Sequence, residues 1–215
     1  MPSGTSLYLQ FRIVSGAAVD PHSVLTAALD AAPIASLLIG TQSETALDPA
    51  SIRPLVALAQ ERGVAVLLPA DASLAAKVSA DGIHIPWSAD VVQQFKTARG
   101  GAGGMIVGAD AGRTRHDAME LGESGADYVA FGIPAHVEDR QRAAERQVDL
   151  ISWWSEVFEI PCVALDVATV EQAGLLAKAG ADFVGVAING DEPATEAAAR
   201  VRAYLQAIAA YEDVK

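Results

Sequence analysis

The fold is decided by the stretch Ala177-Lys178-Ala179-Gly180-Ala181-Asp182-Phe183-Val184-Gly185-Val186-Ala187, which combines a helix end, a glycine stop and an apolar strand. Gly180 is expected to adopt the left-handed conformation that ends a helix. The side chain of Asp182 is expected to accept hydrogen bonds from backbone N–H groups of the tight turn that leads into the strand. The apolar run that follows does not alternate with polar residues, which is typical of parallel strands covered on both faces. Because parallel strands require crossover helices, the stretch predicts a β/α protein.

The same pattern occurs twice more along the chain. Residues 124–132 read Ser-Gly-Ala-Asp-Tyr-Val-Ala-Phe-Gly, and residues 78–85 repeat the pattern more loosely as Val-Ser-Ala-Asp-Gly-Ile-His-Ile. Each copy predicts the end of one helix and the start of the next strand. The repeat therefore indicates a chain built from successive β/α units.

Composition supports one compact domain that spans residues 1–215. With 51% hydrophobic and 20% charged residues, the chain can bury a large core. Its formal net charge of −12 argues against nucleic acid or an anionic membrane as a partner, since both require basic patches. Cys162 is the one cysteine, so no internal disulfide can form. Residues 1–6 lack the features of a signal peptide and no apolar run reaches the ~18 residues of a membrane span, so we expect a cytoplasmic protein.

Strand and helix patterns alternate eight times. Strands are predicted at residues 7–14, 34–39, 64–68, 82–85, 105–109, 128–131, 162–165 and 183–186. Helices are predicted at residues 20–31, 48–62, 71–78, 88–98, 114–123, 148–158, 169–179 and 195–210, with a charged segment at 137–147 ahead of the sixth. Eight pairs in strict order favour a closed (β/α)8 TIM barrel over an open doubly wound sheet.

In such a barrel the functional residues follow the carboxyl ends of the strands. Aligning the three repeats places His84 in register with Ala130 and Gly185, while the bulky neighbours of each should pack under helices. His84 is therefore predicted to point into the barrel, where its imidazole could reach a ligand. The alternative is a core histidine that is bonded to a backbone carbonyl.

The chain resembles the thiamine phosphate synthases and their relative thiazole tautomerase over nearly its whole length. The run from Leu67 through Asp71 to Ser79-Ala80-Asp81-Gly82-Ile83-His84-Ile85-Pro86-Trp87 is similar to the third and fourth strands of that family. Residues 125–132 and 179–186 resemble the sixth and eighth strands with their entry turns. The resemblance implies a TIM barrel of thiamine biosynthesis that couples a pyrimidine methyl diphosphate to a thiazole phosphate with Mg²⁺ on the diphosphate.

The positions that the resemblance assigns to metal ligands carry other residues here. The asparagine and aspartate after the third strand become Pro69 and Ala70, and the second metal-binding aspartate falls on Ala89, with Asp90 one place away. Neither proline nor alanine binds a metal. We therefore predict no certain cofactor and no metal ligands.

The positions that the resemblance assigns to anion binding have changed as well. The threonine-rich lysine loop after the sixth strand becomes residues 134–140, where Arg140 alone keeps a cation. The paired glycines after the seventh strand become Asp166-Val167, and the serine after the eighth becomes Ile188 or Asn189. A carboxylate repels a phosphate, so the mouth is predicted to favour cations or neutral polar molecules.

Two explanations remain open. One is a catalytically degenerate member that binds a small polar ligand or a partner; the other is an active enzyme with changed acid–base or metal-assisted chemistry, or a residual synthase. Acidic residues at strand ends can equally be helix caps, as considered for Asp71, Asp110 and Asp166. The adjacent indoles Trp153 and Trp154 leave a homo-oligomer open.

The candidate residues at the predicted mouth, where a small-molecule ligand should bind, fall into two groups. His84, His136 and Asp166 are the predicted catalytic residues, of which His136 lies near the place of the tautomerase histidine after the sixth strand. The predicted ligand-binding residues are Asp71, Trp87, Asp110, Arg140 and Asn189.

Overall fold

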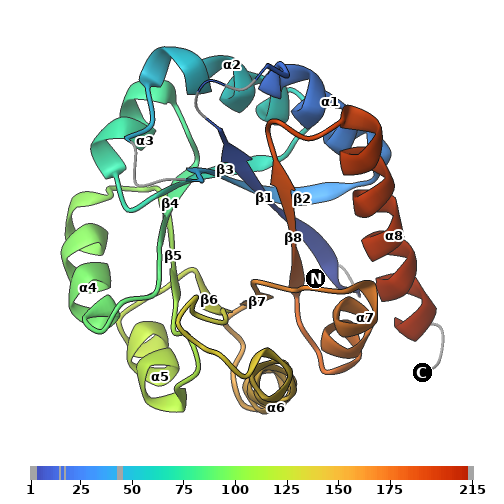
Figure 1. The fold of residues 1–215 in the computed structure, drawn as a ribbon. Helices are drawn as coiled ribbons and strands as arrows, with labels where there is room; N and C mark the ends of the chain where they lie inside the picture. The colour runs from blue at the N-terminus through green and yellow to red at the C-terminus, as the bar shows by residue number, and fades with distance from the viewer. Residues whose placement is uncertain (1–3, 15, 17, 43–45, 213–215) are drawn as a thin grey trace.

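The computed structural model describes residues 4–14, 16, 18–42 and 46–212, and it forms a closed barrel (Figure 1). Eight parallel strands pair in chain order, and β8 closes the barrel on β1. The strands are β1 (Ser6–Ile13), β2 (Ile34–Thr41), β3 (Ala65–Pro69), β4 (Gly82–Ile85), β5 (Ile106–Asp110), β6 (Tyr128–Phe131), β7 (Cys162–Ala164) and β8 (Phe183–Asn189). The predicted (β/α)8 TIM barrel is therefore confirmed.

In the described part of the chain, a ring of eight helices surrounds the strands (Figure 1). They are α1 (Pro21–Ala31), α2 (Pro49–Gln60), α3 (Ala72–Val78), α4 (Val91–Gly101), α5 (Arg115–Glu123), α6 (Arg140–Val157), α7 (Val170–Lys178) and α8 (Ala194–Glu212). The largest difference from the prediction is α6, which begins at Arg140 instead of near Val148. Its charged first turns form a solvated helix because Asp139 caps them, accepting a hydrogen bond from the Arg142 amide.

Aspartates begin three other helices as the sequence predicts. Asp20, Asp48 and Asp71 accept hydrogen bonds from the backbone amides of the first turns of α1, α2 and α3. In α1 and α2 a proline follows the cap, where its missing N–H costs nothing. Helix starts were therefore predictable wherever an Asp-Pro pair or a lone aspartate precedes an apolar repeat.

The repeated Gly-Ala-Asp turns close the amino-terminal end of the barrel. Gly125 and Gly180 adopt the predicted positive φ, at +86° and +98°. Each turn aspartate reaches the preceding strand: Asp81 Oδ2 accepts from the Val66 amide, and Asp127 Oδ2 accepts from the Val107 amide. The prediction that the aspartate bonds its own turn was wrong in this respect, because the nearest unpaired donor belongs to the neighbouring strand.

Two apolar layers hold the barrel together. Side chains between strands and helices form the larger layer, which includes Leu37, Ile83, Val129 and Phe131. Inside the barrel a smaller cluster consists of Tyr8, Leu67, Tyr128, Ala130, Val163 and Leu165. Alternation along each strand divides the residues between these layers, as the register of the repeats predicts.

The remaining structural predictions have clear outcomes. Cys162 is buried in β7. Trp154 is fully buried, and Trp153, which is partly exposed, lies under the Arg115 guanidinium of α5 at 4.6 Å. None of the helices in the described part of the chain is long and apolar enough to cross a membrane.

Candidate active site

Two carboxylates meet at the carboxyl end of the barrel. Asp110 is the last residue of β5, Asp166 follows β7, and Gly132 follows β6, the strand between them. A Cβ atom added to Gly132 would collide with Asp110 Oδ2 and would lie 3.0 Å from Asp166 Oδ2. Both oxygens therefore approach one point beside Gly132, and only glycine leaves room for the pair.

The Asp110 carboxyl is almost fully buried, with 7% of its surface exposed. Its Oδ1 accepts hydrogen bonds from the Gly112 amide at 2.7 Å and from the Gly132 amide at 2.8 Å. Burial raises the pKa of Asp110 to about 7, the two amides oppose this shift, and the nearby Asp166 adds to it. Near neutral pH Asp110 therefore exchanges a proton within the range that acid–base catalysis uses.

Asp166 holds a backbone conformation that side chains rarely adopt. Its φ is +55°, and its Oδ2 accepts a hydrogen bond from the Ile133 amide at 3.0 Å. Such strain persists only where the surroundings impose it, and it concentrates at functional sites. The alternative of helix capping is wrong for Asp110 and Asp166, because Thr114 and Thr169 cap α5 and α7.

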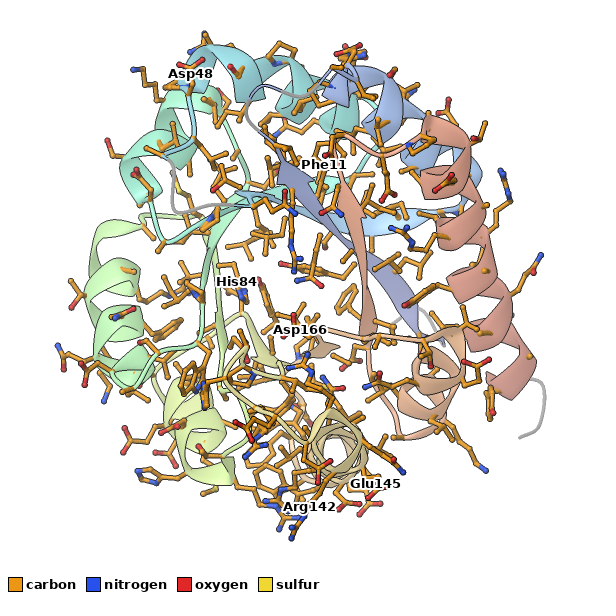
Figure 2. The ribbon with its side chains drawn as sticks, viewed as in Figure 1. Phe11, Asp48, His84, Arg142, Glu145 and Asp166 are labelled. Carbon is orange, nitrogen blue, oxygen red and sulfur yellow. The ribbon has the colours of Figure 1, made fainter. Side chains whose placement is uncertain are left out.

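His84 points into the barrel as predicted, and 3% of its surface is exposed. Its Nδ1 shares a hydrogen bond of 2.8 Å with the Tyr128 hydroxyl, which in turn lies 3.1 Å from the Tyr8 hydroxyl. Burial lowers the pKa of His84 to about 4 and raises the pKa values of both tyrosines, so the chain of three groups is neutral at pH 7. Figure 2 places His84 inside the ring of helices, in the same central region as Asp166.

Trp87 and His136 form an aromatic pair at the rim of the barrel. Their ring centroids are 5.1 Å apart, and the Trp87 indole also lies against Gly112, whose amide bonds Asp110. Trp87 is 37% exposed. The structure thus brings these two predicted residues together beside the loop that follows Asp110, while His84 lies inside the barrel, bonded to Tyr128.

The other predicted residues lie apart from the carboxylate pair or are engaged elsewhere. Arg140 donates to the carbonyl oxygens of Ile133 and Pro134, so it supports the loop after β6. Asp71 caps α3, and its Oδ1 accepts a hydrogen bond of 2.8 Å from the Leu74 amide. Asn189 ends β8 in register with Arg12, and Ser15, another strand-end residue, lies outside the described residues.

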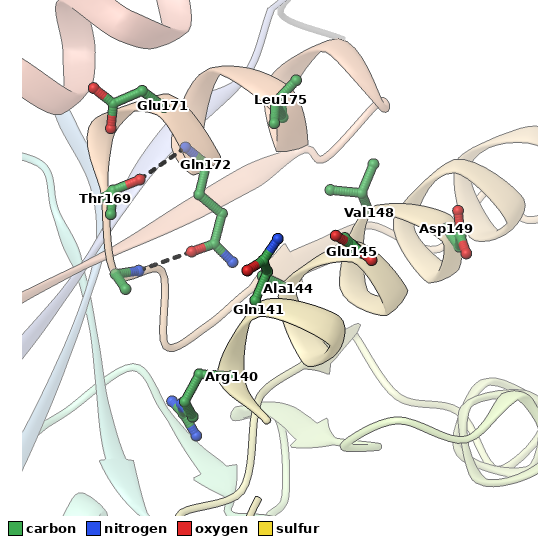
Figure 3. Close-up of a pocket in the computed structure, with 11 residues that line it drawn as sticks. Arg140, Gln141, Ala144, Glu145, Val148, Asp149, Thr169, Glu171, Gln172 and Leu175 are labelled. Carbon is green, nitrogen blue, oxygen red and sulfur yellow. Dashed lines mark hydrogen bonds between the residues drawn. The ribbon is translucent and has the colours of Figure 1, made fainter. Parts of the chain in front are cut away.

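A polar link connects the strand ends to a groove on the outside of the barrel. Gln147, buried in α6, donates to the carbonyl oxygens of Phe131 and Leu165, and it accepts from Gln172 of α7. Gln172 lines a groove of about 590 Å³ between α6 and α7 (Figure 3). The link fixes the peptides that precede Gly132 and Asp166, and thereby the position of the pair.

Sequence reasoning missed several residues of this site. Tyr128 could have been found, because it stands two places before Ala130 and therefore on the inward face that holds His84. Gly132 and Gln147 carried no such signal. A glycine between two strand-end carboxylates and a glutamine that faces inward from a helix become visible only in three dimensions.

Three comparisons with known proteins place the chain. A family model described as thiamine monophosphate synthase matches residues 14–189. The chain belongs to this family. It is 37% identical over 182 residues to a thiamine-phosphate synthase of Rhodospirillum centenum, which covers 81% of this chain and 85% of that protein. It is also 40% identical over 151 residues to a thiamine-phosphate synthase of Hyphomonas neptunium, covering 70% and 67% of the two chains.

A solved structure of the same kind shares the fold. The thiamine phosphate pyrophosphorylase from Pyrococcus furiosus superposes with a TM-score of 0.72 over 95% of this chain and 96% of that one, at 18% identity. The predicted thiamine phosphate synthase-like barrel is therefore confirmed at the level of family and fold.

The Mg²⁺ of the resembled family finds no matching donor set here. Ala70 and Ala89 occupy the expected ligand positions, and Asp71 already accepts a backbone amide. Within residues 4–14, 16, 18–42 and 46–212, no cluster of three His, Cys, Asp or Glu residues could hold a metal ion. The donor set at these positions does not fit the ion, which prefers octahedral oxygen coordination with one or two carboxylates.

Proposed function

We propose that this barrel catalyses the condensation of its family, the coupling of a pyrimidine methyl diphosphate to a thiazole phosphate, at a residual rate. The observation that carries the proposal is the 37% identity with a thiamine-phosphate synthase over 85% of that protein. A small-molecule site at the barrel mouth and action in the cytoplasm are parts of the same proposal. They fit a barrel that brings two carboxylates together at its carboxyl end.

The proposed rate is low because the chain has lost neutralising groups. Ala70 and Ala89 bring no charge to the leaving diphosphate. The guanidinium of Arg140 donates hydrogen bonds to the carbonyl oxygens of Ile133 and Pro134. Stabilisation of developing charge is usually the largest contribution to catalysis. Removing several such groups lowers the rate without removing the cavity that orients the two substrates.

In the proposed site Asp110 holds a proton below about pH 7. A protonated Asp110 can donate a hydrogen bond to an anionic oxygen of the substrate, whereas an ionised one would repel it. Because burial raises the pKa of Asp110 to about 7, this donor is lost as the pH rises through neutrality. The condensation rate should therefore fall on the alkaline side of pH 7.

The test is condensation by the purified protein, with product measured by chromatography. We expect turnover above the protein-free mixture but well below about 1 s⁻¹, the lower end of common enzyme rates. Gly132→Ala and Asp166→Asn should each reduce it at least about tenfold, because they disturb the carboxylate pair. Asp149→Asn on the exposed face of α6 removes the same charge far from the pair and should leave the rate unchanged. Absence of product at every pH from 5 to 9 would reject the proposal.

Proton transfer on a small polar ligand is the second candidate function. It is favoured by the meeting of Asp110 and Asp166 across Gly132, an arrangement that keeps one proton available near pH 7. Exchange of solvent deuterium into the carbon-bound hydrogens of the thiazole phosphate, followed by NMR, tests it. Exchange without condensation would favour this candidate. Binding with neither activity would restore the degenerate, ligand-binding interpretation.

A further inference from the structure

We infer that a pocket between the β5–α5 loop and the first turns of α6 binds a small phosphate- or diphosphate-bearing anion. The pocket has a volume of about 420 Å³. Its lining residues are Arg113, Val137, Asp139, Arg142, Ala143 and Arg146. This site is separate from the carboxylate pair, and the inference does not depend on condensation activity.

Three guanidinium groups converge on this pocket in a chain whose formal net charge is −12. In the described part of the chain, none of these three guanidinium groups has a hydrogen-bond or ion-pair partner. Other arginines behave differently: Arg62 pairs with Asp30, and Arg99 pairs with Asp127. The pocket therefore collects three positive charges against a single carboxylate, that of Asp139.

The arrangement on α6 is unfavourable unless an anion is bound. Arg142 and Arg146 stand four residues apart, so they lie side by side on the helix and repel each other. Asp139 is the single carboxylate of the lining, and its Oδ1 is engaged by the Arg142 amide as the helix cap. An anion with two or more charges would reverse the repulsion, because each guanidinium can bind two oxygens of a phosphate.

The position of the pocket distinguishes it from the barrel mouth. Figure 2 shows Arg142 at the outer edge of the molecule beside α6, whereas His84 and Asp166 lie near its centre. Arg140, two residues before Arg142 in the same helix, donates to the carbonyl oxygens of Ile133 and Pro134 and does not line the pocket. A small anion fits this location, because the net charge of the whole chain would repel a long polyanion.

Inorganic diphosphate is the probe, with EDTA present so that no metal complex forms. Binding is measured by isothermal titration calorimetry and by the shift in melting temperature, at two concentrations of sodium chloride. We expect binding that weakens as salt rises. Arg142→Gln and Arg146→Gln should each weaken the affinity about tenfold or more, the loss typical of a charge-assisted hydrogen bond. Arg202→Gln, an exposed change of the same charge on α8, should alter it less than about twofold.

Each other outcome overturns the inference. Absence of binding at 10 mM diphosphate would show that the three arginines are only solvated. An equal loss of affinity in Arg202→Gln would mean that diphosphate binding depends on the overall charge of the protein and not on this pocket. A gain in affinity in Asp166→Asn, with Arg142→Gln unaffected, would place the anion at the barrel mouth. Circular dichroism of each variant checks that the fold is retained.

Discussion

The two ends of the barrel use aspartate in opposite ways. At the amino-terminal end, Asp81, Asp127 and Asp182 each accept one backbone amide of the preceding odd-numbered strand, at 2.7 to 2.8 Å. At the carboxyl end, Asp110 and Asp166 approach each other beside a glycine. The first set joins neighbouring strands, while the second set places two acidic groups together, and the pKa of one of them, Asp110, is raised.

The difference between the two sets of aspartates shows that the unfavourable interactions lie at the carboxyl end of the barrel. The amino-terminal aspartates are in contact with solvent and bond donors that would otherwise lack partners, so they add stability. The carboxyl-terminal pair combines burial, a neighbouring like charge and a positive φ at Asp166, each of which costs stability. Groups that a fold retains at a cost are the strongest candidates for function.

The largest expected effect is a pH dependence of the free energy of unfolding that comes from Asp110 at the carboxyl end of the barrel. Burial raises the pKa of Asp110 from 3.8 to about 7, so the folded protein keeps a proton that the unfolded chain has released. The contribution of this group to stability is fully present below about pH 4 and is lost as the pH rises to about 7, a span of about 4 kcal/mol. In Asp110→Asn, which is neutral at every pH, this fall should disappear. Urea unfolding of both proteins between pH 4 and 8 measures it.

His84 has the opposite sign in the same experiment. Burial lowers its pKa from 6.5 to about 4, so its contribution to stability is present above about pH 6.5 and is lost as the pH falls towards 4. Both proteins contain His84, so its contribution cancels when the free energy of unfolding of Asp110→Asn is subtracted from that of the wild type. Parallel curves for the two proteins would show that Asp110 titrates at its ordinary pKa.

Adding one methyl group between the carboxylates should have the next largest effect. In Gly132→Ala the new Cβ collides with Asp110 Oδ2 and comes within 3.0 Å of Asp166 Oδ2. We expect a loss of about 3 kcal/mol in the free energy of unfolding, the upper range for overpacking. Gly104→Ala is the matched control, since its Cβ would meet nothing within 4 Å. Equal stability of the two variants would mean that the carboxylates move aside freely.

Removing a hydroxyl inside the barrel should cost less. Tyr128→Phe leaves His84 Nδ1 and the Tyr8 hydroxyl without their shared partner in a fully buried cluster. We expect a loss of about 2 kcal/mol in the free energy of unfolding. Phe183→Leu, a change in a partly buried side chain that packs on the same cluster, tests the effect of apolar contact alone. A titratable His84 signal above pH 6 in NMR spectra of the wild type would contradict the buried, neutral assignment.

The smallest effect is expected at the amino-terminal end. Asp182→Ala removes the acceptor for the Cys162 amide, which lies 2.8 Å from Asp182 Oδ2. Because the carboxylate is exposed, the free energy of unfolding should fall by about 1 kcal/mol. Hydrogen exchange at the Cys162 amide should become faster. Asp149→Ala on α6 should change neither quantity. A loss as large as that of Gly132→Ala would mean that the two ends of the barrel are equally strained.

The sequence by itself determined the alternation of elements and the ends of several of them. Asp20, Asp48 and Asp71 cap the helices that they were expected to cap, and Gly125 and Gly180 take the left-handed conformation. These features depend on a few neighbouring residues and on backbone sterics, which local sequence specifies. The inward direction of His84 was predictable for the same reason, because alternation along a strand is local.

Tertiary structure alone decided which strand-end residues meet. Asp110 and Asp71 both stand at the carboxyl ends of apolar strands and precede helices, yet Asp71 caps α3 while Asp110 accepts a hydrogen bond from Gly132, which follows the next strand. The early start of α6 likewise extends the helix back into the charged segment at 137–147, which carries Arg142 and Arg146. Side chains from separate β/α units come together only when the barrel closes, and closure depends on the packing of all eight strands at once.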